Sequence, residues 1–292
     1  MYSYTIKDME NLSGIKAHTI RIWEQRYSFL KPERTDTNIR YYSGEELKKL
    51  LNVALLNKYG FKISHIDKMD EVEVKEKIFS LNQVQAQQER IVNELIQYMI
   101  DLDLEKFETV LDNYILSRGF DKTIHQIIFP YLEKIGILWL TNHINPAQEH
   151  LVTNIIRQKL VVGINSTICP IKLNTKILLF LPEGEYHELG LLFMHYLLKC
   201  RGINVIYLGC SIPVKDVEYV VRAKKPDYLY CHLTSVGHKF NFENFLADLS
   251  KQFPDIPVII SGQLTAGYQK KLHPPIIFKR SFAESLEFVN NL

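Results

Sequence analysis

A continuous apolar run from Ile177 to Leu181 leads through the polar segment Glu185-Tyr186-His187 into a helical pattern. The run has the length of a strand and no polar alternation, which is typical of a parallel strand covered on both faces. The apolar residues after it recur at spacings of three and four, as a buried helix face requires: Leu189, Leu192, Phe193, Tyr196 and Leu197. A strand that passes into a helix in this way predicts an α/β fold, in which ligands bind at the carboxyl ends of strands.

The same alternation continues to the end of the chain. Strand-like runs at 203–208, 228–233, 258–260 and 276–278 alternate with helical stretches near 214–224, 240–252, 263–272 and 281–291. Five such units predict a flavodoxin-like, doubly wound α/β domain with a parallel sheet over residues 174–292.

The middle of the chain has helical periodicity only. Apolar residues at helical spacing between 84 and 165 predict a four-helix bundle, which we place at residues 91–168. The stretch 71–90 before it is rich in Glu, Lys and Gln, which predicts a mobile linker.

The first seventy residues have helix-turn-helix spacing, with one helix from Thr5 to Leu12, a turn at Ser13-Gly14 and a second helix from Lys16 to Tyr27. Cations and hydroxyl groups gather on one face of the second helix and in the segment after it: Lys16, Thr19, Arg21, Arg26, Arg34, Arg40 and Tyr41. Such groups suit contacts with the phosphates and grooves of double-stranded DNA. The alternative is a small helical domain with an ordinary solvated basic face.

The string Thr19-Ile-Arg-Ile-Trp-Glu-Gln-Arg-Tyr27, followed by 31–35 and 39–43, closely resembles the winged helix of the MerR family. In particular, it is similar to the branch that carries cobalamin-binding domains. The resemblance covers residues 1–70 and implies a DNA-binding transcriptional regulator that acts as a homo-oligomer.

The cluster Glu185-x-His187-x-x-Gly190 resembles, with one substitution, the Asp-x-His-x-x-Gly signature of cobalamin-binding domains. The resemblance implies that His187 is the metal ligand, on the lower axial side of cobalt. Neutral imidazole is a good ligand for cobalt, and a preceding carboxylate can hold its other ring nitrogen in the right tautomer. For isolated residues, the alternative is a polar loop with an exposed histidine at a helix start.

Trp139 stands ten residues before Glu149-His150, a Trp-x9-Glu-His arrangement. It resembles the helical cap of cobalamin-dependent photoreceptor and sensor regulators, in which these residues lie over the upper face of the corrin and contact its adenosyl group. The resemblance therefore favours adenosylcobalamin as the cofactor. Taken singly, Trp139 suits a bundle core, and Glu149 and His150 suit a solvated first turn after Pro146.

The chain departs from the cobalamin-binding pattern at three positions. Glu185 is one methylene longer than the family's Asp, and the family's small residues, a Ser-x-Leu step and a Gly-Gly pair, are replaced by 231–235 and 261–263. The resemblance places the nucleotide tail of the cofactor beside His232, Ser235 and Gly262. The bulky His232 and Gln263 either shrink that slot or contribute hydrogen bonds to it.

Composition agrees with this assignment but adds little to it. The net charge of +2 does not by itself indicate a nucleic-acid partner, so the DNA argument rests on local charge. The four cysteines are scattered without metal-ligand spacing, which fits a reducing cytosol. No segment reads as a signal peptide or a membrane span, and we expect a cytoplasmic protein without a membrane partner.

We therefore expect a transcriptional regulator, and not an enzyme, in which cobalamin binding alters oligomerisation and operator affinity. One alternative is a MerR-type regulator whose degenerate sensor has lost cobalamin and serves protein interaction. A weaker one is a cobalamin methyl-carrier module of an enzyme, because 292 residues leave no room for a substrate barrel beside the three parts.

Overall fold

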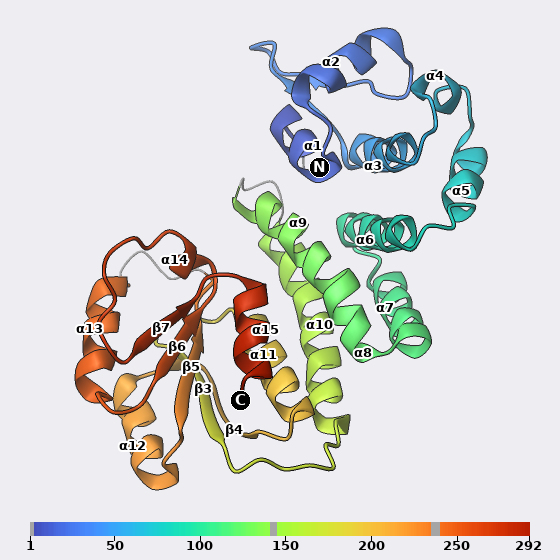
Figure 1. Cartoon of the computed structure of the whole chain (residues 1–292). Coiled ribbons are helices and arrows are strands. Elements are labelled where there is room, and N and C mark those ends of the chain that lie inside the picture. The colour runs from blue at the N-terminus through green and yellow to red at the C-terminus, as the bar shows by residue number, and fades with distance from the viewer. Residues whose placement is uncertain (1–2, 141–144, 235–239) are drawn as a thin grey trace. The chain divides into compact units, whose positions relative to one another are not determined.

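The computed structural model describes residues 3–140, 145–234 and 240–292, with side chains for all of these except 137–140. The chain forms two compact units, Met1–Ile155 and Ile156–Leu292, each with its own core. Figure 1 shows the order of their elements along the chain.

Unit 1 begins with a helix-turn-helix and a short wing. Its elements are α1 (Ile6–Ser13), α2 (Ala17–Arg26), β1 (Glu33–Arg34), β2 (Arg40–Tyr41), α3 (Gly44–Lys58) and α4 (Ile63–Ile66). Thr5 caps α1 in a reciprocal pair with Asp8, and Gly14 ends it in the left-handed conformation, so the predicted turn is confirmed. Ile20 and Trp23 are the buried residues of α2, and they fix which face of that helix stays outside.

The secondary-structure elements in the rest of the described part of unit 1 are helices, as the sequence predicts. It contains α5 (Glu71–Phe79), α6 (Val84–Asp101), α7 (Leu104–Arg118), α8 (Phe120–Thr123), the π-helical turn η1 (Ile124–Ile128), α9 (Phe129–Leu140) and the start of α10 (Pro146–Ser166). The predicted linker at 71–90 forms α5 and the first turns of α6. Asp70 caps α5, and Ile78, Leu81 and Ala86 are buried. That this stretch acts as a mobile linker stays a prediction.

Unit 2 holds a parallel sheet flanked by helices. In its described residues the strands are β3 (Lys176–Pro182), β4 (Asn204–Ile212), β5 (Tyr228–His232), β6 (Val258–Ser261) and β7 (Ile276–Lys279), in the order β4-β3-β5-β6-β7. Every pairing is parallel. This is the flavodoxin-like order, and the predicted doubly wound α/β domain is confirmed.

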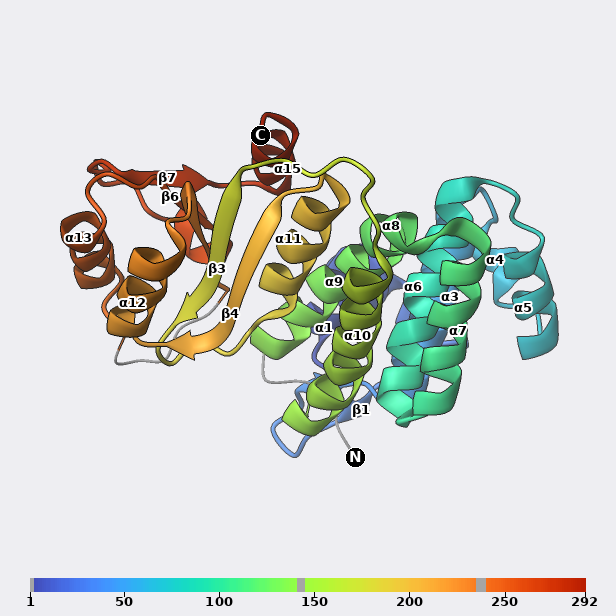
Figure 2. The same cartoon turned by 90° about the horizontal axis from the view of Figure 1, so that it is seen from below.

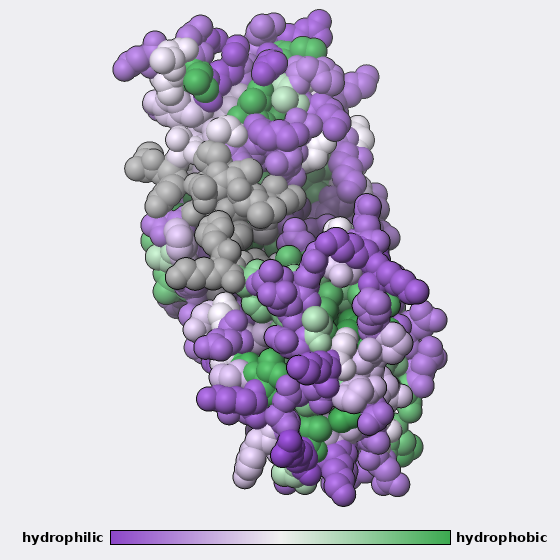
Figure 3. All heavy atoms as spheres, turned by 90° about the vertical axis from the view of Figure 1, so that its left-hand side faces the viewer, coloured by the Kyte–Doolittle hydropathy of each residue, from purple (hydrophilic) through white to green (hydrophobic). Residues whose placement is uncertain are grey.

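Helices cover both faces of this sheet. They are α11 (Leu189–Cys200), α12 (Val214–Lys224), α13 (Phe242–Gln252), α14 (Gln263–Ala266) and α15 (Phe282–Asn290). Helices α11 and α15 lie on one face, joined by the rings of Phe193 and Phe282 at 5.7 Å, while α12 and α13 lie on the other (Figures 1 and 2). On the outer side of α12 and α13, hydrophilic side chains surround small hydrophobic patches (Figure 3), as expected for amphipathic helices.

Helix α14 is shorter than the sequence predicts, since it stops at Ala266 instead of continuing toward 272. Tyr268 instead packs its ring edge-on against Phe242 and Phe278, at 5.5 and 5.6 Å. Burial of this aromatic contact outweighs the weak local preference for one more helical turn.

The order of the strands creates a switch point between β3 and β5. These strands are neighbours in the sheet, but the chain leaves β3 through α11 to β4 and leaves β5 through α13 to β6. Because the two connections depart to opposite faces, the carboxyl ends of β3 and β5 are the position at which open α/β sheets usually bind ligands. The Glu185-His187 segment follows β3 directly, and His232 is the last residue of β5.

We expect Leu178→Ala, in the interior strand β3, to lower the free energy of unfolding of this domain by about 2–5 kcal/mol, because it leaves a cavity in a close-packed core. Leu178 has 0% exposure, whereas Ile277 on the edge strand β7 is 43% exposed and provides a matched control. Thermal and urea denaturation followed by circular dichroism should show Ile277→Ala much closer to the parent. Equal losses would contradict the assignment of β3 to the interior of the sheet.

The half-buried imidazole of His195 on α11 stacks on Tyr207 of β4 at 5.3 Å, and burial lowers its pKa from 6.5 to about 4. Between these values the unfolded chain takes up a proton that the folded chain refuses, so this contribution to stability is lost as the pH falls. We expect the melting temperature of His195→Gln to fall less than that of the parent between pH 7 and pH 5. The same change at the exposed His273 should leave the parent's pH dependence intact.

Candidate functional site

The loop after β3 holds a histidine and a carboxylate in a fixed arrangement. Oε1 of Glu185 accepts hydrogen bonds from the backbone N–H of His187 at 2.9 Å and from its ring Nδ1 at 2.7 Å. The Glu185 side chain is 0% exposed, and that of His187 is 47% exposed. With Nδ1 engaged by the carboxylate, Nε2 is the nitrogen through which this ring can bind a metal ion.

Backbone bonds to the end of β4 hold this loop in place. Gly184 has φ of 84°, which favours glycine, and its N–H donates to the hydroxyl of Ser211 at 3.2 Å. The N–H of Ser211 in turn donates to the carbonyl oxygen of Glu185 at 3.0 Å. In this loop the Glu185 side chain, although one methylene longer than an aspartate, reaches the ring of His187.

Glu188, next to the proposed ligand, is clamped by two further side chains of unit 2. Its Oε1 pairs with Nε of Arg157 on α10, and its Oε2 accepts from the hydroxyl of Tyr207 on β4 at 2.9 Å. Burial and the Glu188 carboxylate raise the pKa of Tyr207, so this hydroxyl stays a donor. Sequence reasoning missed Arg157 and Tyr207, because neither has a spacing that links it to Glu188.

His232, at the end of β5, lies close to Gly190 in the first turn of α11. Its Nδ1 lies 2.8 Å from the hydroxyl of Ser261, which also lies 2.6 Å from the Tyr230 hydroxyl. A Cβ atom at Gly190 would lie 2.3 Å from Cδ2 of His232. Burial lowers the pKa of His232 to about 4, so the ring is neutral near pH 7.

The other predicted residues near the end of β5 behave differently. Gly262 has φ of 98°, and a Cβ atom there would lie 2.3 Å from the carbonyl oxygen of Leu233, so only glycine fits. Gln263 is exposed at the start of α14. Ser235 lies outside the described residues.

The proposed upper-face residues belong to unit 1. Glu149 and His150 lie in the first turns of α10, with Oε2 and Nδ1 3.1 Å apart, and the His150 side chain is 73% exposed. The side chain of Trp139 lies outside the described part of the chain. That these residues and His187 serve one cofactor therefore stays a prediction.

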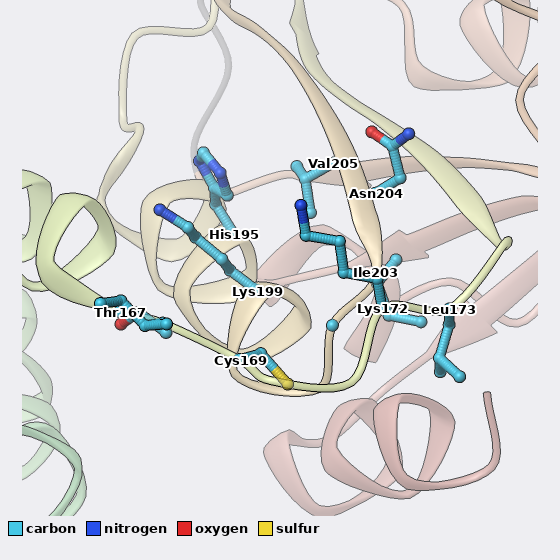
Figure 4. Close-up of a pocket in the computed structure, with 11 residues that line it drawn as sticks. Thr167, Cys169, Lys172, Leu173, His195, Lys199, Ile203, Asn204 and Val205 are labelled. Atoms are coloured by element: carbon cyan, nitrogen blue, oxygen red, sulfur yellow. The ribbon is translucent and has the colours of Figure 1, made fainter.

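A groove of about 500 Å³ lies at the other end of the sheet (Figure 4), where α11 runs into β4. His195 and Lys199 reach it from α11, while Cys169 and Lys172 come from the segment before β3. Because it lies at the amino ends of β3 and β4, it is separate from the Glu185–His187 loop. Within the described residues, no group of three or more His, Cys, Asp or Glu side chains could hold a metal ion.

The predicted DNA-binding side chains lie on α2 and the wing. Arg21 and Arg26 are exposed on α2, Thr19 is half-exposed, and Lys16 at its N-cap reaches Glu10 at 3.3 Å. On the wing, Arg34 donates to Asn38 at 2.6 Å.

Arg40 and Tyr41 are more constrained than the sequence suggests. Nε of Arg40 pairs with Glu24 of α2 at 3.0 Å, and the same carboxylate accepts from the hydroxyl of Tyr42. The hydroxyl of Tyr41 donates to Glu33 across the wing at 2.5 Å. Arg40 therefore fastens the wing to α2, a structural role that its place in the sequence did not reveal.

Two family descriptions match parts of the chain. Residues 4–72 match the MerR HTH family of regulatory proteins, and residues 91–162 match the B12 binding domain. The first match covers the helix-turn-helix and wing, and the second covers helices of the middle bundle.

Similar proteins cover nearly the whole length. The chain is 27% identical to the HTH-type transcriptional repressor CarH of Myxococcus xanthus, over 91% of each chain. It is 26% identical to the repressor CarA of the same organism, over 97% of this chain and 93% of the other. The monomethylamine corrinoid protein of Methanosarcina barkeri shares the fold, with a TM-score of 0.51 and 11% identity over 70% of this chain and all of that one.

Among the described helices, none combines the length and apolar character that crossing a membrane requires. From the family matches to residues 4–72 and 91–162, the chain carries the helix-turn-helix domain of the MerR family of regulatory proteins together with a B12 binding domain.

Proposed function

We propose that the protein is a transcriptional regulator that binds double-stranded DNA and senses cobalamin, with His187 as the lower axial ligand of cobalt. The observation that carries the proposal is the Glu185–His187 pair at the switch point of the sheet, in a chain with MerR and B12 binding domains. The named relatives are repressors, which supports regulation and not catalysis as the role of this chain.

The residues of the ligand loop fit a corrinoid. Cobalamin supplies a cobalt centre whose axial ligands exchange. In this chain His187 offers a half-exposed ring, and Glu185 fixes its tautomer and increases its basicity through Nδ1. The clamp of Arg157 and Tyr207 on Glu188 restrains the backbone beside that ring, which lowers the cost of ordering it on binding.

The remaining parts of the proposal follow from the domain composition. Trp139, Glu149 and His150 would cover the upper face of the cofactor, and the adenosyl form would use that cover most fully. MerR-type domains suggest a homo-oligomer on paired half-sites, with ligand binding changing the assembly and hence the DNA affinity. A regulator of this kind would act in the cytoplasm.

Replacing the proposed ligand tests the cofactor site. We expect His187→Ala to abolish the absorption change that marks histidine ligation of cobalt, and Glu185→Gln to weaken binding about 10–100-fold by removing the charge behind the ring. The visible spectrum of the full-length protein, titrated with an excess of hydroxocobalamin and of adenosylcobalamin, is the measurement. His273→Ala, an exposed histidine elsewhere in unit 2, is the control.

If the wild-type protein shows no spectral change with any corrinoid in excess, the cofactor proposal is wrong. That result would favour the alternative in which the sensor region serves protein interaction. Retained ligation in His187→Ala would move the ligand to another side chain.

Charge removal on α2 and the wing tests DNA binding. Arg21→Ala and Arg34→Ala should each weaken binding to promoter DNA and reduce the salt slope by about 1, as loss of one phosphate contact does. Arg40→Ala should weaken binding with a smaller change of slope, because Glu24 already neutralises that charge. Fluorescence anisotropy across a salt series measures both quantities.

Lys106→Ala on α7 removes the same charge from an exposed position outside residues 4–72 and serves as the control. If Arg21→Ala and Arg34→Ala bind like Lys106→Ala at every salt concentration, this face does not contact DNA.

A further inference from the structure

We propose that the ring of His232 fills the space that the nucleotide tail of a complete cobalamin needs, so that the sensor prefers corrinoids without this tail. The inference rests on the proposed cofactor site, and it names the ligand class that the site selects.

The first observation is the contact between His232 and Gly190. Gly190 lies in the first turn of α11, three residues after the proposed ligand His187. A Cβ atom on Gly190 would lie 2.3 Å from Cδ2 and 2.4 Å from Nε2 of His232, far below the 3.0 Å limit of real Cβ contacts. The glycine leaves room beside the ligand loop, and the imidazole of His232 occupies that room.

The second observation is that His232 is held there. Its Nδ1 and the Tyr230 hydroxyl both contact the hydroxyl of Ser261, which is 2% exposed in the neighbouring strand. Moving the ring away would break this hydrogen bond and leave the buried Ser261 hydroxyl with the Tyr230 hydroxyl but without the imidazole partner. The His232 ring is therefore held in place beside Gly190 and is not a loosely packed side chain.

The third observation concerns the other glycine of the predicted slot. Gly262 is packed against the backbone of Leu233, because a Cβ atom there would lie 2.3 Å from the carbonyl oxygen and 2.8 Å from the carbonyl carbon. Gln263, the other bulky departure, is exposed and does not enter this space. Of the two bulky residues, His232 alone narrows the slot.

The chemistry of the cofactor gives this packing a consequence. In a complete cobalamin the benzimidazole of the tail binds the lower face of cobalt, so His187 can bind only if that base leaves and is accommodated elsewhere. Cobinamide, which lacks the nucleotide, carries exchangeable water at that position. His187 can replace this water while His232 keeps its place against Gly190.

Parallel titrations of the full-length protein with hydroxocobalamin and aquacobinamide, followed by visible absorption, test the preference. We expect the wild-type protein to bind cobinamide at least tenfold more tightly than cobalamin. His232→Ser should lower the ratio of the cobalamin to the cobinamide dissociation constant at least tenfold, because cobalamin binding improves. His232→Asn, which can keep a hydrogen bond to Ser261, guards against loss of folding in the serine variant, and circular dichroism checks both.

Gln263→Gly is the matched control, because it removes the other bulky side chain and should leave the ratio unchanged. Equal or tighter binding of cobalamin by the wild-type protein, or an unchanged ratio in both folded His232 variants, would overturn the inference and leave His187 ligation standing. If neither corrinoid changes the spectrum of the wild-type protein or of the His232 variants, the proposed cofactor site itself fails.

Discussion

The buried carboxylate of Glu185 is the constraint on which the cofactor loop depends. A charge with 0% exposure is costly unless hydrogen bonds satisfy it, and in this loop Oε1 accepts from both the backbone and the ring of His187. Those bonds fix the turn after β3 and the orientation of the imidazole together. The hydrogen bonds that stabilise this polar turn are therefore also the ones that orient the ring and leave Nε2 as the nitrogen for a ligand.

The clamp on Glu188 extends this constraint into the rest of unit 2. Arg157 of α10 and Tyr207 of β4 hold the two carboxylate oxygens of the residue that follows His187. Charge-assisted bonds of this kind are stronger than neutral ones and restrict two side chains and a loop at once. The backbone beside His187 is therefore anchored to Arg157 and Tyr207 through Glu188.

Local periodicity predicted the strands, most helices and the site loop, because each depends on residues close in the sequence. The β3–α11 junction was predicted from the apolar run 177–181 and from the spacing of Leu189, Leu192 and Tyr196. The contact between Glu185 and His187 could be predicted because the two residues are only two positions apart. Two other contacts join residues that are far apart in the sequence. His232 and Gly190 are 42 positions apart, and Arg40 and Glu24 are 16 positions apart. Such contacts arise from the register of strands and the packing of the wing, which single-sequence patterns do not encode. The burial of three side chains within 71–90 was likewise not evident from the polar composition of that stretch.

The wing shows why local charge is an incomplete guide to a DNA-binding surface. In the sequence, Arg40 is one more cation beside Arg34. In the structure, its charge is paired with the Glu24 carboxylate, which also accepts a hydrogen bond from the hydroxyl of Tyr42. The field that a phosphate meets is therefore set mainly by exposed cations such as Arg21, Arg26 and Arg34. The proposed contribution of Arg40 to DNA binding is through the position of the wing, since a loosened wing would carry Arg34 away from α2. The number of exposed charges therefore does not describe this surface fully, because the partly buried pair of Arg40 and Glu24 joins the wing to α2.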